Sequence, residues 1–328
     1  MNNCIFIKQF PKKQYSPLAK CTHYSFSYHL ELNNWRRVWF IALALLILLP
    51  PILKASDSTA YNKKRFTALV TTTGTLYTVG MLGLGQVWYK EQLTNSFTFF
   101  NDNGEWNYMD KMGHFYTSFL ISDMSVHMLK WSGCSHKKSI WYGGLTGAAL
   151  MLPIEVFDGF SAEYGASWGD LTANTLGSAA VISQYLLWDE IRIMPKFSYH
   201  HSQYAELRPN TLGSTPTEQL IKDYNGQTYW LSFNIASLTH SQKIPKWFNL
   251  SLGYGANGMI YAEPSENIAN GYTSYSQVFL GLDIDLTRIK TKSKFLKTVF
   301  YGLNYIRLPL PALEYNGEQG FIFHPLYF

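Results

Sequence analysis

The chain has 328 residues, which is enough to bury one large core or two smaller ones. Aromatic residues make up 16% of it and charged residues only 15%, against about 25% charged in an ordinary soluble domain. The net charge is +5, but residues 1–55 hold seven Lys or Arg and one Glu. The remainder has 20 basic and 21 acidic residues, so no basic surface argues for nucleic acid. Few charges and many aromatic rings favour a membrane–water boundary, with an aromatic-rich soluble β protein as the alternative.

The first segment, residues 1–55, contains a predicted export signal. Residues 38–49 are an unbroken apolar run preceded by Arg36 and Arg37 and followed by small residues, which is typical of a secretory signal peptide. The run is shorter than the roughly 20 apolar residues of a spanning helix, so a signal peptide is favoured over a retained anchor. Residues 1–34 are either an over-long gene start or a disordered arm.

Cysteine usage agrees with export. Cys4 and Cys21 precede the apolar run, so Cys134 is alone in the exported chain and makes no internal disulfide. No cysteine follows the run at the place where a lipoprotein-type anchor would be attached.

Residues 56–195 are predicted to form a helical bundle associated with a membrane. Residues 66–89 carry no charge and are rich in Gly and Thr, which makes a poor soluble helix. Small residues let helices approach closely inside a membrane, so we predict a spanning or half-buried helix here. The spacing of Gly143 and Gly147 likewise predicts a close helix contact. Further helices are predicted over 111–131, 139–157 and 168–191.

From residue 196 to residue 328, prolines and alternating patterns replace the helical ones. Thr215 and Glu218 have the spacing of a capping box with a Pro at the first helical position, which predicts a short helix over 216–224. The predicted strands are too few for a closed barrel of eight, so we predict a smaller antiparallel β-rich region after the bundle and an α+β fold overall. The strands are expected at 228–235, 248–254, 276–286 and 300–308.

Three stretches of the predicted bundle each carry two polar residues about one turn apart. Side chains three or four positions apart lie on one helix face, so each pair points the same way. Packed helices would then bring all six polar groups to one end of the bundle, and we predict that Asp110, His114, Glu155 and Asp170 face one pocket. Ionisable groups beside apolar helices of membrane length are costly and tend to mark function. The candidate site residues are Asp110, His114, Glu155, Asp158, Asp170 and Asn174.

Each of these residues also has a structural interpretation. Asp110 and Asp170 are suited to the first turn of a helix. Glu155 and Asp158 fit a solvated helix C-terminus, although the helix dipole disfavours carboxylates there. Taken together the residues fit acid–base chemistry, with His114 as base oriented by Asp110 or Asp170, or a divalent metal ion as cofactor. No H-E-x-x-H pattern is present. The metal candidates are His114, Glu155, Asp158 and Asp170.

The same motifs carry a family resemblance. The sequences D-K-M-G-H at 110–114, E-V-F-D at 155–158 and D-L-T-A-N-T-L-G at 170–177 resemble the YfiM-like predicted periplasmic lipoprotein family, a domain of unknown function. Their order is more loosely similar to that of VanZ-like membrane proteins. The resemblance covers about residues 65–192, and the tail from Lys196 resembles an extension of longer members. This chain departs from the lipoprotein label because it lacks the lipidated cysteine.

These observations lead to three functional hypotheses. The first is an exported, membrane-associated envelope protein, facing the periplasm, whose polar cluster binds a membrane lipid or a cell-wall-related ligand such as a lipid-linked precursor. The second is a structural scaffold that contacts other envelope proteins through an aromatic β surface, with the polar groups linking helices. The third is a metal-dependent or acid–base hydrolase or transferase.

Overall fold

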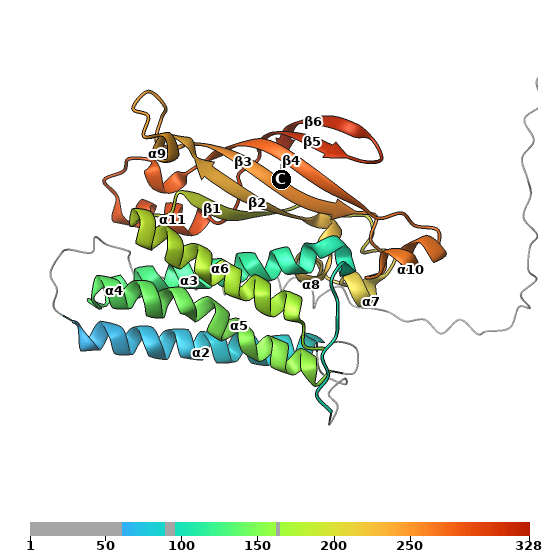
Figure 1. Ribbon diagram of the computed structural model, residues 1–328, viewed down its shortest axis with the longest axis horizontal. Helices are drawn as coiled ribbons and strands as arrows, with labels where there is room; N and C mark the ends of the chain where they lie inside the picture. The colour runs from blue at the N-terminus through green and yellow to red at the C-terminus, as the bar shows by residue number, and fades with distance from the viewer. Residues whose placement is uncertain (1–60, 89–95, 162–164) are drawn as a thin grey trace, which may run out of the picture. The chain divides into compact units, whose positions relative to one another are not determined.

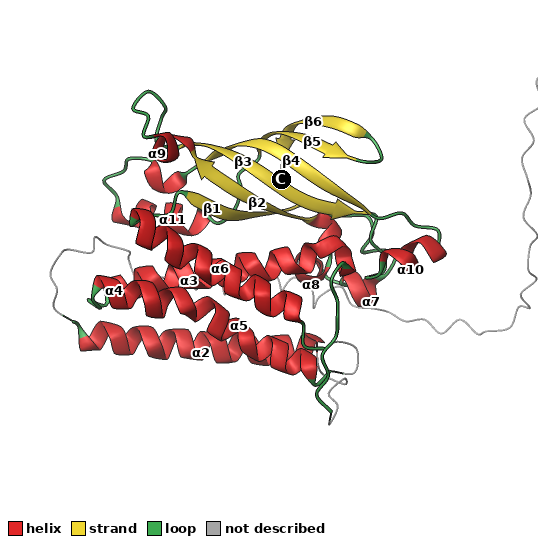
Figure 2. Cartoon of the chain, viewed as in Figure 1, coloured by secondary structure: helices red, strands yellow, loops and turns green. Residues whose placement is uncertain are grey.

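The computed structural model describes residues 61–88, 96–161 and 165–328 (Figure 1). The predicted signal peptide and the rest of segment 1–55 lie outside the described residues. Within the described part, the long helices lie together on one side and the strands form a sheet on the other (Figure 2). The predicted α+β class, with a helical part followed by an antiparallel sheet, is confirmed.

The helical part contains four long helices. They are α2 (Lys63–Trp88), α3 (Met109–Trp131), α5 (Gly144–Gly159) and α6 (Trp168–Trp188). Each falls in a stretch predicted to be helical, within a few residues at its ends. Between α3 and α5 the chain forms a short helix, α4 (His136–Lys138), and a wider π turn (Ser139–Gly143). The 3₁₀ turn η1 (Glu105–Tyr108) leads into α3.

Small residues allow α3, α5 and α6 to pack closely, as the glycine spacing predicted. A Cβ atom at Gly147 would overlap the backbone oxygen of Ser118, and one at Gly177 would overlap that of Phe115. The Ser118 hydroxyl donates to the Asn174 carbonyl at 2.6 Å, and it also lies 3.1 Å from the Ser178 hydroxyl. Where α3 meets α5 and α6, the helices are therefore held by backbone contacts and by hydrogen bonds from serine hydroxyls rather than by bulky side chains.

Helix α2 lies against the other helices through few specific contacts. The Tyr77 hydroxyl donates to the Leu150 carbonyl at 2.8 Å, and the Asn62 amide donates to the Ser132 carbonyl. Among the described residues, one helical stretch, His136–Gly159, is long and apolar enough to cross a membrane, a test that a core helix of a soluble protein also passes.

The sheet has six antiparallel strands in chain order. They are β1 (Ile193–Tyr199), β2 (Gln227–Asn234), β3 (Phe248–Asn257), β4 (Tyr275–Ile284), β5 (Leu310–Asn316) and β6 (Gly320–Tyr327). Short helices occupy the connections: α7 (Pro209–Leu212), α8 (Pro216–Lys222), α9 (Ile235–Thr239), α10 (Pro264–Ala269) and α11 (Lys294–Leu303). The 3₁₀ turns η3 (Tyr224–Gly226) and η4 (Leu286–Arg288) precede β2 and α11. Helix α8 begins at the predicted capping box, where the Thr215 hydroxyl accepts from the Glu218 amide.

One strand prediction is wrong. The stretch 300–308 is not a strand, because its first residues complete α11. The Ser293 hydroxyl caps that helix by accepting from the Leu296 amide at 3.3 Å. Apolar residues in so short a stretch fit a helical face as well as an alternating one.

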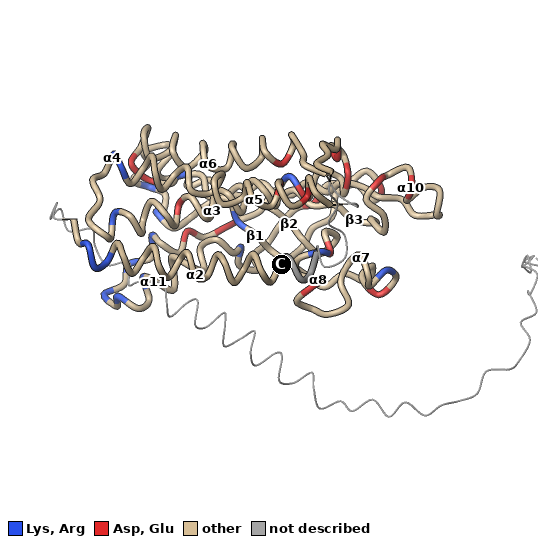
Figure 3. Tube along the Cα trace, turned by 90° about the horizontal axis from the view of Figure 1, so that it is seen from below, with Lys and Arg blue, Asp and Glu red and all other residues tan. Residues whose placement is uncertain are grey.

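Charge is unevenly distributed along the molecule. Figure 3 shows many Lys and Arg residues at the end where α4 and α11 lie. Exposed basic residues at this end include Lys63, Lys64, Arg65, Lys137, Lys138, Lys290, Lys292, Lys294 and Lys297.

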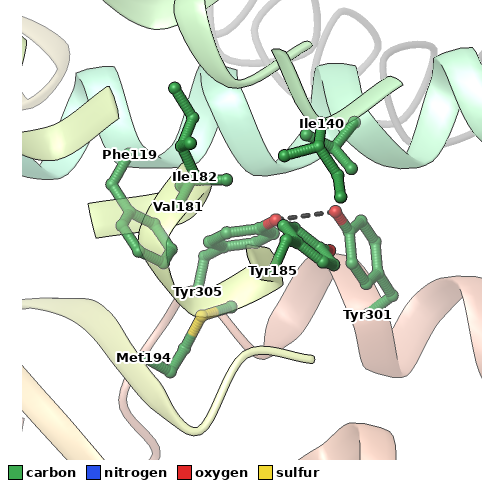
Figure 4. Close-up of a cluster of buried hydrophobic side chains, with 9 residues drawn as sticks. Phe119, Ile140, Val181, Ile182, Tyr185, Met194, Tyr301 and Tyr305 are labelled. Atoms are coloured by element: carbon green, nitrogen blue, oxygen red, sulfur yellow. Dashed lines mark hydrogen bonds between the residues drawn. The ribbon is translucent and has the colours of Figure 1, made fainter. Parts of the chain in front are cut away.

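The core between helices and sheet contains a buried carboxylate. Phe119, Val181 and Tyr185 pack there with Tyr305, which comes from the segment after α11 (Figure 4). The hydroxyls of Tyr185 and Tyr305 donate to the two oxygens of Asp123 at 2.7 and 2.6 Å. Hydrogen bonds to both oxygens compensate the cost of burying this group.

Candidate functional site

A strained turn positions the start of α3. Trp106, Asn107 and Tyr108 all have positive φ angles, of 49°, 50° and 63°. Residues other than glycine rarely adopt this left-handed conformation, and each costs on the order of 1–3 kcal/mol. The turn is held from the sheet side, because the Tyr254 hydroxyl donates to the Asn107 carbonyl at 2.7 Å. The strain therefore lies immediately before Asp110, where the polar cluster begins.

Lys111 is the positive centre of the cluster. Its ammonium nitrogen lies 2.6 Å from Asp102, 3.1 Å from Asp110 and 2.8 Å from Asp170. The side chain is only 11% exposed, so water screens these attractions weakly. One lysine thus joins the loop before α3, the first turn of α3 and the first turn of α6.

His114 lies between two sets of acceptors. Its Nδ1 atom is 3.2 Å from the Asn174 side-chain oxygen and 3.4 Å from Glu155. Its Nε2 atom faces Asp110 at 3.8 Å and Asp170 at 3.9 Å. Helices α3, α5 and α6 therefore all contribute to the surroundings of one imidazole ring.

The start of α6 links the loop to the cluster. The Ser167 hydroxyl is the N-cap: it accepts from the Asp170 amide at 3.2 Å and donates to Asp102 at 2.5 Å. The Ser167 amide donates to Glu155 at 3.4 Å. Capping of this helix and assembly of the cluster thus depend on the same residue.

Burial and charge shift the titration of the cluster in opposite directions. Burial would raise the pKa of Asp110, but His114, Lys111 and a hydrogen bond from Tyr224 outweigh it and lower that pKa to about 2. Burial, together with the Asp110 charge, raises the pKa of Asp170 to about 8. Burial also raises the pKa of Glu155 to about 7, against the effect of His114.

The imidazole and a neighbouring carboxyl are shifted as well. Burial would lower the pKa of His114, but Asp110, Asp170 and Glu155 raise it above its ordinary value. Burial and the charge of Asp102 raise the pKa of Glu105 in η1 to about 7. The site therefore holds several groups that exchange protons near neutral pH, which is what acid–base chemistry requires.

Five of the six predicted site residues come together in one cluster. Asp110, His114, Asp170 and Asn174 contact one another directly or through Lys111, and Glu155 joins them through the imidazole. Asp158 lies one turn beyond Glu155, is half-buried, and acts on the cluster by raising the pKa of Glu155.

Sequence reasoning missed several members of the cluster. Asp102 lies outside the three motifs, and Lys111 lies within the D-K-M-G-H motif but was not among the predicted site residues. Tyr224, more than a hundred positions away, donates to Asp110 at 2.7 Å. Adjacency to Asp110 was a signal for Lys111, and the capping position was one for Ser167. Nothing local marked Tyr224.

The arrangement changes the candidate metal set. Three residues, Asp110, His114 and Asp170, each offer one possible ligand atom. These three atoms lie within 4.8 Å of one another, a spacing that suits a cation. The donor types fit a divalent ion. Glu155, however, faces the other ring nitrogen, and the Lys111 ammonium already lies against two of these carboxylates. A metal ion at this position would have to displace that ammonium.

Comparisons with known proteins bear on this region alone. No curated protein and no solved structure matches the chain. A family model described as "Predicted periplasmic lipoprotein (DUF2279)" matches residues 98–187, and this span contains all six predicted site residues. The description agrees with the predicted export and cell-envelope location. Residues 98–187 thus match the model of the predicted periplasmic lipoprotein family that their motifs resemble.

Proposed function

We propose that this envelope protein binds, through the cluster around His114 and Lys111, a lipid or cell-wall-related molecule that carries a cationic amine. The observation that supports the proposal is the charge of the cluster. Four carboxylates, those of Asp102, Asp110, Glu155 and Asp170, surround one lysine and one histidine. The cluster thus holds more carboxyl groups than cations, and a ligand that supplies positive charge would stabilise the ionised forms of Glu155 and Asp170 in place of their protons.

Asp110 is the carboxylate of the cluster that a ligand from solvent would contact first. Its side chain is 26% exposed, whereas those of Glu155 and Asp170 are 2% and 6% exposed. Its lowered pKa keeps it ionised at neutral pH. A primary amine docking here would meet an ionised, partly exposed carboxylate, with the protonatable carboxyls of Glu155 and Asp170 behind it.

An aromatic patch beside the cluster supports an amphipathic ligand. Phe97, Phe99, Phe100 and Trp168 are all exposed, and the rings of Phe99 and Trp168 are stacked with centroids 5.0 Å apart. Trp168 directly follows Ser167, which bonds to Asp102 of the cluster. The apolar part of a ligand would rest on these rings while its polar end reaches Asp110.

A titration of the detergent-purified full chain tests this function. The probes are dihexanoyl phosphatidylethanolamine, dihexanoyl phosphatidylglycerol, which lacks the amine, and glucosamine, which has the amine without acyl chains. We expect an amine-bearing probe to bind about tenfold more tightly than phosphatidylglycerol, and Asp110→Asn to remove about that factor. Preference for glucosamine or for the lipid separates a cell-wall source from a membrane source.

The control is Glu206→Gln, at an exposed carboxylate in the loop before α7, which should leave binding unchanged. Equal affinity for phosphatidylethanolamine and phosphatidylglycerol with no binding of glucosamine would overturn the proposal. Amine binding that survives Asp110→Asn unchanged would also overturn it.

A structural role is the second candidate, because Lys111 lies against three carboxylates from separate segments. In that case the cluster is a polar framework that holds α3, α6 and the preceding loop together. Asp110→Asn would then lower the melting temperature and leave all three probes without effect.

A further inference from the structure

The two faces of the sheet have the opposite polarity from that of an ordinary antiparallel sheet in water. Such a sheet usually presents apolar side chains to a core and polar ones to solvent. Here the buried face carries most of the polar side chains and the exposed face is apolar. This feature is separate from the polar cluster of the helices and does not depend on the proposed ligand.

The buried face carries polar residues on all six strands, around a small cluster of Trp230, Phe279, Ala312 and Tyr327. Lys196 of β1 pairs with Asp283 of β4 at 2.8 Å, and their side chains are 1% and 0% exposed. Glu314 of β5 accepts from Gln277 at 2.6 Å and lies 2.7 Å from His324 of β6. Further buried polar residues on this face are Ser198, Thr228, Ser232, Asn234, Asn249, Ser251 and Asn316.

The sheet curls around this polar face. The hydroxyls of Thr228 on β2 and Tyr327 on β6 lie 3.0 Å apart, although three strands separate β2 from β6 in the sheet order. Arg307 donates to the Tyr327 carbonyl at 2.8 Å, and its backbone amide donates to Phe197 of β1. Curvature therefore brings both edges of the sheet toward the segment that contains Arg307 and turns the other face outward.

The outer face has continuous apolar rows. Strand register places Leu231 opposite Leu252, Leu252 opposite Leu280, Leu280 opposite Leu313, and Leu313 opposite Phe323. All five residues of this row are exposed, from 38% at Leu231 and 39% at Leu313 to 65% at Phe323. A neighbouring row ends in Val278, Tyr315 and Phe321, which are at least half exposed.

Among the residues that the structure describes, only those at one end of this face are covered. Tyr116 of α3 packs against Phe197 and Tyr229, so the helices cover β1 and part of β2. Beyond β2 the row from Leu252 to Phe323 remains exposed. Contiguous exposed apolar patches of this kind mark interaction sites rather than ordinary solvent-facing surface.

We infer that the outer face of β3–β6, centred on the row Leu252, Leu280, Leu313 and Phe323, contacts the acyl chains of a lipid bilayer. A polar interior with an apolar exterior is the arrangement that strands adopt in hydrocarbon, where inward-facing polar groups are satisfied by one another. Strands β3 and β4 have ten residues each, or about 34 Å, close to the roughly 30 Å of a hydrocarbon layer.

Two further features favour lipid over a protein partner. The helical side also exposes apolar residues, among them Val79, Leu82, Leu152 and Leu187. Helix α2 and the sheet lie on opposite sides of α3 and α6 (Figure 1), so a single docked protein would cover only one of these surfaces. The basic end near α4 and α11 (Figure 3) suits the anionic head groups that border a bilayer.

Spin-label accessibility tests the inference on the full chain, with Cys4, Cys21 and Cys134 replaced by Ser. A nitroxide is attached at Leu280→Cys or Leu313→Cys, and the protein is reconstituted into vesicles of three parts phosphatidylethanolamine to one part phosphatidylglycerol. We expect collisions with oxygen to exceed those with a water-soluble nickel chelate at both positions. A label at Glu206→Cys, on an exposed loop, should show the reverse.

Two outcomes would overturn the inference. Nickel accessibility at Leu280→Cys equal to that at Glu206→Cys would mean that the face is in water. Low accessibility to both reagents would mean that protein, either a second copy or another partner, covers it. Vesicle flotation is the second measurement: Leu280→Glu with Leu313→Glu should reduce association several-fold, while Leu207→Glu at an exposed position outside the sheet should not.

Discussion

The helix-end cluster and the interior of the sheet both bury several charged groups, but they balance charge differently. In the sheet, Lys196 has Asp283, and His324 lies against Glu314. In the helix-end cluster, Lys111 is shared by three carboxylates. The sheet interior matches these groups one to one, whereas the helix-end cluster holds more carboxyl groups than cations.

This difference separates groups buried for structure from groups suited to a function. A buried charged group that has its own counter-ion is stabilised in its ionised form. A carboxylate that shares its cation, as Asp170 does, is shifted toward neutral pH by burial and by repulsion from Asp110. Shifted pKa values of this kind are typical of functional sites.

The largest effect is expected from removing a cation from the sheet. Lys196→Met leaves Asp283 buried without its counter-ion, which costs about 3–5 kcal/mol of unfolding free energy. Lys111→Met should cost less at pH 6, because Asp170 and Glu155, with pKa values of about 8 and 7, are already largely protonated at that pH and leave less negative charge uncompensated. Denaturant unfolding of both variants in detergent measures the two losses.

Lys243→Met, at an exposed lysine, is the matched control and should change stability by less than about 0.5 kcal/mol. A loss for Lys111→Met equal to that for Lys196→Met would show that the two networks do not differ in the proposed way.

The next effect is a dependence of stability on pH. The pKa values of Asp170 and Glu155 are about 8 and 7 in the folded chain, above the ordinary carboxyl range near 4. The folded state therefore holds more protons than the unfolded state between about pH 4 and 8, and stability falls as pH rises through this window. Asp170→Asn should remove part of that fall and melt about 2–4 °C above the parent at pH 8.5.

Melts of the parent and of Asp170→Asn at pH 5.5 and 8.5 give the comparison, with Glu206→Gln as a control that should follow the parent. If Asp170→Asn melts several degrees lower at both pH values, Asp170 belongs to the structural framework, and the contrast with the sheet disappears.

The smallest effect is expected at the edge of the cluster. Tyr224→Phe removes one hydrogen bond to Asp110 and should cost about 1 kcal/mol, because the ammonium of Lys111 still compensates the carboxylate. The same change should move the pKa of Asp110 upward from about 2, which carboxyl NMR titration would detect. An unchanged pKa would show that Tyr224 contributes little to the charge balance.

Much of the fold follows from local pattern. The uncharged stretch 66–89 and the helices of residues 111–191 were predicted because long apolar segments leave little ambiguity. Strands β2, β3 and β4 were predicted from their alternation. Strands β5 and β6 were missed, since Pro311 and Pro325 lie inside them and proline argues against a strand.

The candidate site was predictable for the residues that repeat along helices. The spacing of one helical turn paired Asp110 with His114 and Asp170 with Asn174. In the structure Asp110, Asp170 and Asn174 all lie beside the imidazole of His114. Tyr224 carries no such signal, because it reaches the cluster from the connection before β2. Only packing between distant segments reveals such a residue.

By itself, the sequence determined the helical pairs of polar residues, the glycines that let helices touch, and the alternation of the central strands. These are periodic, local properties, and periodicity needs no tertiary contact to be recognised. The tertiary structure decided that Lys111 forms ion pairs with three carboxylates, and it decided which face of the sheet is buried. An alternating strand specifies two faces of different polarity, but only curvature and the closing contact between Thr228 and Tyr327 bury the polar face and leave the leucines outside.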